Sequence, residues 1–279
     1  MTVTRKNIKA DLHIHSNFSD GKYSPLELLQ KAKEAGFSAI SITDHDNING
    51  IEAALQHSDE YGIEIIPGIE FSTDYNGKEV HILAYFIDYK NQALIEFIEN
   101  IRKSRVERLR QMIKRLSQLN CIINAEKFLG KYSSNITLGR PHLALEMVSV
   151  KFVKNYVDAF IRFIGDGKPA YVKKPNPDIK TVLNIIAELG GLSFIAHPGK
   201  YFKNTQIQEI IECGVDGIEV MHPSHSYTDI NYFQKVAAQN FMLESGGSDF
   251  HGIVKNDFEN FGNFYVTDRE IVNMKRRLY

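Results

Sequence analysis

The sequence predicts an α/β fold, a (β/α) barrel interrupted by a helical insert. Three observations support this prediction. Strand-like and helix-like segments alternate towards both ends of the chain, glycines follow several of the helices, and a long middle stretch has little strand signal. Alternating strands and helices imply parallel strands joined by crossover helices. Their repetition favours a barrel, whose active site lies at the carboxyl ends of the strands.

The amino-terminal part contains a regular strand–helix alternation: strand 9–14, helix 24–36, strand 37–43, helix 49–61 and strand 63–66. The start of the first helix is the clearest local signal. Ser24 is typical of an N-cap, Pro25 of the first helical position, and Glu27 completes a capping box. Gly36 then ends the helix.

The same alternation returns near the carboxyl end: helix 178–189, strand 192–196, helix 205–213, strand 215–221, helix 228–239 and strand 241–245. Asp178 is the predicted N-cap of the first of these helices, and Gly190 follows its end.

The middle of the chain lacks this alternation. Apolar residues at helical spacing from Leu94 to Leu116 predict a long amphipathic helix, and further helices are expected at 140–148 and 151–164. We therefore expect a discontinuous barrel domain, residues 1–90 and 167–279, with a helical insert at 91–166.

The composition is that of a soluble globular protein, with 43% hydrophobic and 24% charged residues. The net charge of -1 predicts no broad attraction to nucleic acid or membranes, so no stable DNA binding is expected. No apolar run has the length of a signal peptide or a bilayer span, which favours a cytoplasmic location.

Six short clusters carry side chains of the kind that bind metals: Asp11-Leu12-His13-Ile14-His15 with Asp20 nearby, Thr43-Asp44-His45-Asp46, Gly68-Ile69-Glu70, His81, Ala196-His197-Pro198 and Ser248-Asp249-Phe250-His251. In a strand, His13 and His15 project from one face and could chelate a cation. Alone, this spacing is more often an ordinary histidine pair. Asp249 and His251 repeat it elsewhere, which makes chance a poor explanation.

Most of these clusters lie at or just past the end of a predicted strand, where a barrel builds its active site. Sites of histidine and carboxylate leave positions open for water, unlike cysteine-rich structural sites. Glu70 could bridge two cations, and neighbouring cations can generate a hydroxide and polarise a phosphoryl oxygen. Mn²⁺, Zn²⁺ and Fe²⁺ all suit such ligands.

The clusters resemble the PHP (polymerase and histidinol phosphatase) superfamily over roughly residues 9–90 and 170–265. The motifs are DLHIHSNFSDG, ITDHD, GIEFS, VHILAY, AHPGKY, GIEVMHP and GGSDFHG. The GRPH sequence at 139–142, AHPGKY and the insert further resemble stand-alone phosphoesterases of this superfamily. That subgroup includes nucleoside 3',5'-bisphosphate phosphatases and 5'-to-3' exoribonucleases that act on short RNA.

This resemblance implies a distorted seven-stranded barrel with a site for two or three cations. It also implies three ligand sets: His13, His15, Glu70 and Asp249; Glu70, His81 and His197; and Asp20, His45 and His251. No expected ligand is missing from the sequence.

Further residues are candidates for binding or protonating the substrate. Arg140 and Lys200 could pair with phosphate, and His222 could contact substrate or protonate the leaving oxygen. Arg105 and Arg108 could form a basic wall that attracts phosphates. Each has a plainer interpretation: a solvated cation, an ordinary loop histidine or the solvated face of a helix. The remaining histidines are expected not to bind metal: His57, His142 and His225.

These features together predict a phosphomonoesterase in which a metal-bridging hydroxide attacks phosphorus. A nucleotide or short oligoribonucleotide is the expected substrate. Three alternatives stay open: a histidinol-phosphate phosphatase, a non-catalytic metal-binding module, and an amide hydrolase. In amide hydrolases of related fold a carboxylated lysine often bridges the metals, a role that falls here to Glu70. The oligomeric state is open.

Overall fold

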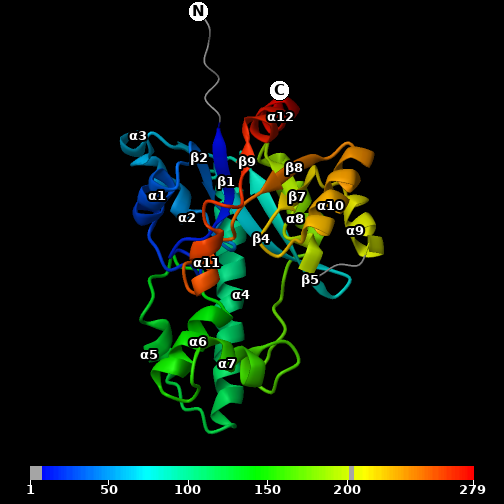
Figure 1. Cartoon of the computed structure of the whole chain (residues 1–279). Helices are drawn as coiled ribbons and strands as arrows, with labels where there is room; N and C mark the ends of the chain where they lie inside the picture. Colours follow the sequence, from blue (N-terminus) through cyan, green and yellow to red (C-terminus); the bar gives the residue numbers. More distant parts are fainter. Residues whose placement is uncertain (1–7, 201–203) are drawn as a thin grey trace, which may run out of the picture. The chain divides into compact units, whose positions relative to one another are not determined.

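The computed structural model describes residues 8–200 and 204–279, without the side chains of residues 200 and 204. The chain divides into two compact units (Figure 1). Unit 1 comprises Met1–Leu94 and Pro177–Tyr279, and unit 2 comprises Ile95–Asn176. The expected insert at 91–166 thus overlaps unit 2, which also takes in residues 167–176.

Unit 1 contains the strands of the described chain: β1 (Lys9–Ile14), β2 (Ala39–Ile42), β3 (Glu64–Ile65), β4 (Gly68–Tyr75), β5 (Lys78–Tyr85), β6 (Leu192–Ile195), β7 (Gly217–Met221), β8 (Leu243–Gly246) and β9 (Val266–Thr267). They form two sheets with the orders β3-β2-β1-β9 and β4-β5-β6-β7-β8. Two isolated bridges link the sheets, Ile14 with Phe250 and His45 with Glu70.

The strands that alternate with helices pair in parallel, as expected: β1 with β2, β2 with β3, β6 with β7 and β7 with β8. The β4–β5 pair is different, because it is an antiparallel hairpin, and β5 is also antiparallel to β6. Asn76 and Gly77 turn this hairpin with φ of 50° and 84°. An Asn-Gly pair favours such a turn, in which both central residues have positive φ.

The helices of unit 1 lie outside the strands, with α1–α3 beside β1 and β2 and with α9 and α10 beside β7 (Figure 1). They are α1 (Pro25–Glu34), α2 (Asn49–Leu55), α3 (Ser58–Tyr61), α8 (Ile179–Glu188), η2 (Pro198–Lys200), α9 (Asn204–Ile211), α10 (Tyr227–Gln239), α11 (Lys255–Asn260) and α12 (Asp268–Leu278). The capping box of Ser24 and Glu27 is confirmed. The single helix expected at 49–61 is wrong, since it breaks into α2 and α3.

Unit 2 is helical. Its helices are α4 (Gln92–Ser117), which begins in unit 1, α5 (Ala125–Leu129), α6 (Arg140–Ser149), α7 (Tyr156–Ala159) and the π-helix η1 (Phe160–Ile164). Met112, Leu116, Phe128 and Leu143 are fully buried in its apolar core. The long amphipathic helix is confirmed as α4, whereas the helix expected from residue 151 begins only at Tyr156.

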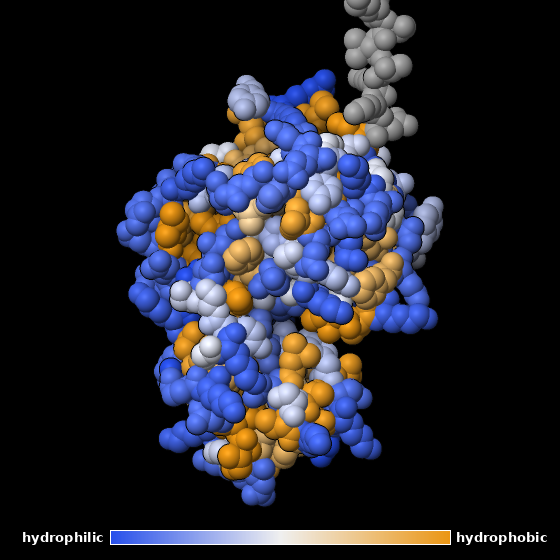
Figure 2. Space-filling model, turned by 90° about the vertical axis from the view of Figure 1, so that its left-hand side faces the viewer, coloured by the Kyte–Doolittle hydropathy of each residue, from blue (hydrophilic) through white to orange (hydrophobic). Residues whose placement is uncertain are grey.

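The core of unit 1 consists mainly of apolar strand residues. Leu12, Leu83 and Phe194 belong to one buried cluster, while Ile14 and Phe250 belong to another. The face in Figure 2 is mostly hydrophilic, with scattered hydrophobic patches. Among the described residues, no helix combines the length and the apolar character that crossing a bilayer requires.

Candidate metal centre

The centre begins on β1, where His13 and His15 are both fully buried. Their ring centroids are 5.1 Å apart, so the two imidazoles share one face of the strand, as their alternation predicts. Glu70, on β4, is 1% exposed and lies opposite them. The bridge between His45 and Glu70 brings His45, three residues past the end of β2, to the same place.

Glu70 lies at the centre of the cluster and contacts most of its histidines. Five histidine nitrogens lie within 3.4 Å of its carboxylate oxygens: His13 Nε2 at 3.4 Å, His15 Nε2 at 3.3 Å and His45 Nδ1 at 3.0 Å from Oε2, and His81 Nδ1 at 2.8 Å and His197 Nε2 at 3.0 Å from Oε1. One buried carboxylate therefore contacts side chains from four separate segments of unit 1.

Two further carboxylates extend the cluster. Asp20 Oδ1 lies 3.3 Å from His251 Nε2 and 3.8 Å from His15 Nδ1. Asp249 Oδ1 lies 3.1 Å from His15 Nε2 and 3.3 Å from His13 Nε2. The structure thus brings together all nine side chains that the sequence suggested as ligands.

Several of the nitrogen and oxygen atoms that could bind a metal are buried without a hydrogen-bond partner: His13 Nε2, both nitrogens of His15, His45 Nδ1, Asp20 Oδ1 and Glu70 Oε2. Leaving buried polar atoms without partners costs about 1–3 kcal/mol each. Four groups of donor atoms lie within 4.8 Å of one another: His15, Asp20, His45 and His251; His13, His222 and Asp249; His13, His15 and Glu70; and His45, Glu70 and His81. These residues fit divalent cations in both chemistry and spacing.

The electrostatics suit a cation site. Burial opposes ionisation of Glu70, but the imidazoles of His45 and His81 outweigh it and hold its pKa well below the usual range. Burial likewise opposes the charged form of His251, yet Asp20 and Asp249 raise its pKa to about 10. Three carboxylates that stay ionised therefore supply the negative charge that cations would neutralise.

Two aspartates of the sequence clusters have another job. Asp11 accepts hydrogen bonds from His13 N, Ser248 N and Ser248 Oγ, and burial raises its pKa to about 7. Asp44 accepts from Ser16 N and Oγ and from Ser19 Oγ. Both side chains hold the loops at the strand ends in place.

Glu219 is the residue that sequence reasoning missed. It is fully buried on β7 and contacts two of the clustered residues, His13 Nδ1 at 2.9 Å and His197 N at 2.6 Å. Its signal in the sequence was a charged residue inside the otherwise apolar segment Gly217–Met221.

The other histidines differ in their surroundings. His222 is 5% exposed and joins the cluster, with Nε2 3.4 Å from Asp249 Oδ2. His225 lies beside it but uses both nitrogens in the fold, since Nδ1 bonds Val220 O and Nε2 accepts from Gly199 N. The cluster does not include the two remaining histidines, His57 and His142.

The arginines expected to bind substrate belong to unit 2. Arg105 and Arg108 are only 6% and 5% exposed, so their interpretation as a solvated helix face is wrong. Arg108 Nε donates to Val172 O at 2.7 Å, and Arg140 pairs with Asp166. The side chain of Lys200 lies outside the described residues.

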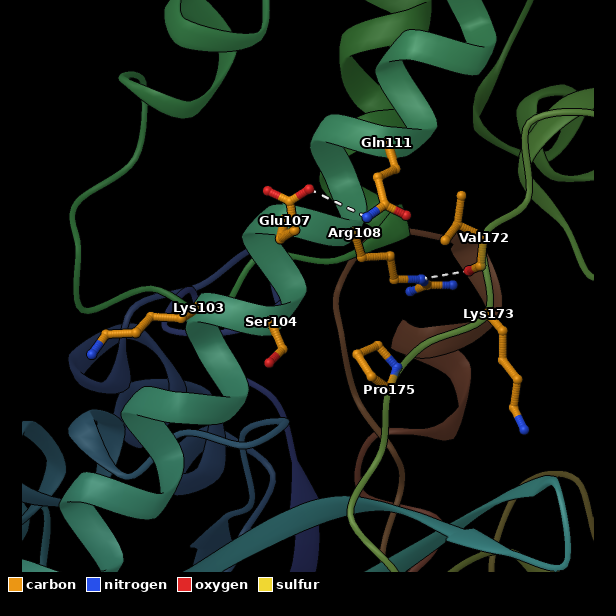
Figure 3. A pocket seen from close by; sticks show the side chains of 8 residues that line it. All are labelled: Lys103, Ser104, Glu107, Arg108, Gln111, Val172, Lys173 and Pro175. Carbon is orange, nitrogen blue, oxygen red and sulfur yellow. Dashed lines mark hydrogen bonds between the residues drawn. The ribbon is translucent and has the colours of Figure 1, made fainter.

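Arg108 also lines a cavity of about 480 Å³ in unit 2 (Figure 3). Its lining residues are Lys103, Ser104, Glu107, Arg108, Gln111, Val172, Lys173 and Pro175. Three cations and one carboxylate make this lining basic, which agrees with the expected local positive charge on the insert.

Comparison with known proteins shows which family the chain belongs to. The PHP domain family model matches residues 11–166. The chain is 32% identical to a 3',5'-nucleoside bisphosphate phosphatase of Chromobacterium violaceum, over 86% of each chain. It is also 32% identical to a 5'-3' exoribonuclease of Haemophilus influenzae, over 87% of this chain and 90% of that protein.

Solved structures agree in fold. A proposed metal-dependent phosphoesterase of Bifidobacterium adolescentis superposes with a TM-score of 0.88 at 29% identity, over 96% of both chains. A Chromobacterium violaceum protein described as an amidohydrolase, with bound sulfate, superposes with a TM-score of 0.82 at 30% identity, over 93% of this chain and 90% of that one. The resemblance inferred from the sequence motifs is confirmed: the chain belongs to the PHP domain family.

Proposed function

We propose that the protein is a metal-dependent phosphoesterase that hydrolyses phosphomonoesters of nucleotides, either nucleoside 3',5'-bisphosphates or short oligoribonucleotides. The observation that carries this proposal is Glu70 with five histidine nitrogens within 3.4 Å of its oxygens. The phosphatase and exoribonuclease relatives support the choice of nucleotide substrates.

The proposed ligand sets are those that the resemblance implies: His13, His15, Glu70 and Asp249 for one cation; Glu70, His81 and His197 for a second; and Asp20, His45 and His251 for a third. When bound, Mn²⁺, Zn²⁺ or Fe²⁺ would supply a hydroxide nucleophile and neutralise charge on the phosphoryl oxygens. We also propose that the strands close into a distorted seven-stranded barrel, which the two bridges between the sheets support.

His222 is the proposed proton donor. Its Nδ1 accepts a hydrogen bond from Ser224 N at 3.0 Å, so in the neutral ring the proton resides on Nε2. Nε2 faces Asp249 at the cluster. Hydrolysis forms a new P–O bond from water and breaks the ester P–O bond; His222 would pass its Nε2 proton to the leaving alkoxide and recover the proton that the attacking water loses.

The other predicted substrate contacts remain part of the proposal. Arg105, Arg108, Arg140 and Lys200 are basic residues, and guanidinium groups match phosphate oxygens in bidentate fashion. We include them as candidates for binding substrate phosphates. A cytoplasmic location is likewise proposed.

A hydrolysis panel on protein of known metal content tests the proposal. It should contain nucleoside 3',5'-bisphosphates, short oligoribonucleotides, a cyclic phosphodiester, histidinol phosphate and an amide substrate. We expect phosphate release from the first class with Mn²⁺, and loss of activity and metal in His13→Ala and Asp249→Ala. Preferred turnover of histidinol phosphate would make that alternative correct. Full metal content without turnover of any ester would indicate a binding module.

A further inference from the structure

We propose that Glu219, which is outside the proposed ligand sets, is a positioning residue that holds His13 and His197 together and thereby couples two cation positions. The inference rests on the proposed function. It deepens that function because His13 and His197 belong to different ligand sets.

The two carboxylate oxygens of Glu219 contact two different residues. The residue is fully buried on β7, and its two oxygens contact different partners. Oε1 lies 2.9 Å from His13 Nδ1, and Oε2 lies 2.6 Å from His197 N. A carboxylate only accepts hydrogen bonds, so both partners must be donors.

The first contact determines which nitrogen of His13 faces the cluster. Because Nδ1 donates its proton to Glu219, the lone pair of the neutral ring resides on Nε2. Nε2 is buried without a hydrogen-bond partner and lies within 3.4 Å of Glu70 and Asp249. A carboxylate behind a ligating histidine sets the tautomer and orientation of the ring.

The second contact secures a strained backbone. His197 has a φ of 31°, in the left-handed region that residues other than glycine rarely adopt. The ladder between β6 and β7 ends at the pair Ile195 and Ile218. The hydrogen bond from His197 N to Glu219 follows directly, where backbone pairing has stopped, and it holds His197 with Nε2 3.0 Å from Glu70 Oε1.

Glu79 provides a natural comparison. Its Oε1 lies 2.9 Å from His81 Nε2, while His81 Nδ1 faces Glu70. Glu79 therefore stands behind one histidine, as Glu219 does behind His13. Glu219 in addition accepts a hydrogen bond from the backbone of His197, so substitution at the two positions should have different consequences.

Glu219→Gln is the sharpest test, because the amide has the same shape but only one acceptor oxygen. We expect the dissociation constants of two cation equivalents to rise together by about 10–100-fold, the usual effect of losing a partner behind a ligand. Competition with a chelator and elemental analysis measure this without any assay of activity. Glu79→Gln should weaken one equivalent, and Glu244→Gln, on the paired strand β8 with Arg269 as its neighbour, should weaken none.

Unchanged cation affinity in Glu219→Gln, or weakening of a single equivalent, would overturn the inference. Unfolding of the metal-free variants shows whether each one still folds, and so separates a loss of ligand positioning from a loss of the fold. If Glu219→Gln does not fold, the wild type offers a second readout: a slowly exchanging imidazole N–H of His13 in the Zn²⁺ form, identified by its loss in His13→Gln. Absence of that proton contradicts the inference. A wild type that binds no cation contradicts the proposed function instead.

Discussion

Replacing Glu70 by Gln should remove most of the cation-dependent stability of the protein. Glu70 contacts all five surrounding histidines, and its pKa is held well below the usual range, so it is ionised at neutral pH. Gln keeps the shape of the side chain but removes the charge, and its amide group can neither bridge two cations nor accept at both ends. The proposed sets that share Glu70 should therefore lose affinity together.

The magnitude follows from linkage between binding and folding. A cation at 100 times its dissociation constant stabilises the folded state by about 2.7 kcal/mol for each site. With a shift of about 2–4 °C per kcal/mol for a domain of 150–250 residues, one filled site raises the melting temperature by about 5–11 °C. In Glu70→Gln this rise should largely disappear.

Thermal unfolding of chelator-treated protein, titrated with Mn²⁺ or Zn²⁺, measures this effect. Each variant is compared with its own metal-free melting temperature, so that any change in intrinsic stability cancels. Glu244→Gln is the matched control and should show the wild-type rise. If Glu70→Gln kept the wild-type rise in melting temperature on adding cation, Glu70 would not be the shared ligand of the metal centre.

Other predictions concern the cap, the titration and the packing of the site. Ser24→Ala removes the N-cap of α1 and should cost about 1 kcal/mol in denaturant unfolding, with cation affinity unchanged. The raised pKa values of His81 and His251, about 9 and about 10, mean that the folded metal-free protein binds these protons more tightly than the unfolded chain. The stability that these two protonated histidines contribute should be complete below pH 6.5 and should be lost as pH rises through 9 to 10; pH-independent stability in this window would contradict the prediction. Cation binding near pH 7 should release protons, which calorimetry in two buffers would detect. Gly247→Ala would place a Cβ 2.4 Å from His13 N and 2.5 Å from Asp11 Oδ1, which should destabilise the fold by about 1–3 kcal/mol and weaken cation binding; wild-type values for both would show that β1 can move.

The features that sequence reasoning predicted well are local or follow from strand ends. The start of α1 depends on Ser24, Pro25 and Glu27, which lie within a single turn, and Ser24 and Glu27 are hydrogen-bonded to each other. The pairing of His13 with His15 follows from the geometry of parallel strands, since both lie at the carboxyl end of β1, which is parallel to β2. Neither needs knowledge of distant contacts.

Some structural features that were not predicted nevertheless have a clear signal in the sequence. The Asn76-Gly77 pair marks the hairpin of β4 and β5, and Thr267 with Glu270 forms the capping box that begins α12. Both are short-range signals with a physical basis.

Other misses depend on contacts that are distant in sequence. The role of Glu219 follows from hydrogen bonds to His13 and His197, and no spacing within its own strand indicates them. Arg140 looked like a free phosphate clamp, yet its guanidinium pairs with Asp166 and lies over the ring of Tyr171. Burial of Arg105 and Arg108 likewise depends on how unit 2 packs.

The most direct test of the account combines metal content with phosphate release on the same protein. Wild-type protein carrying two to three equivalents of Mn²⁺, Zn²⁺ or Fe²⁺ should release phosphate from a nucleoside 3',5'-bisphosphate. Chelation should abolish the release, and added cation should restore it. Full turnover by metal-free protein, or by a His13→Ala variant that binds no metal, would contradict the claim that this cluster is a catalytic metal centre.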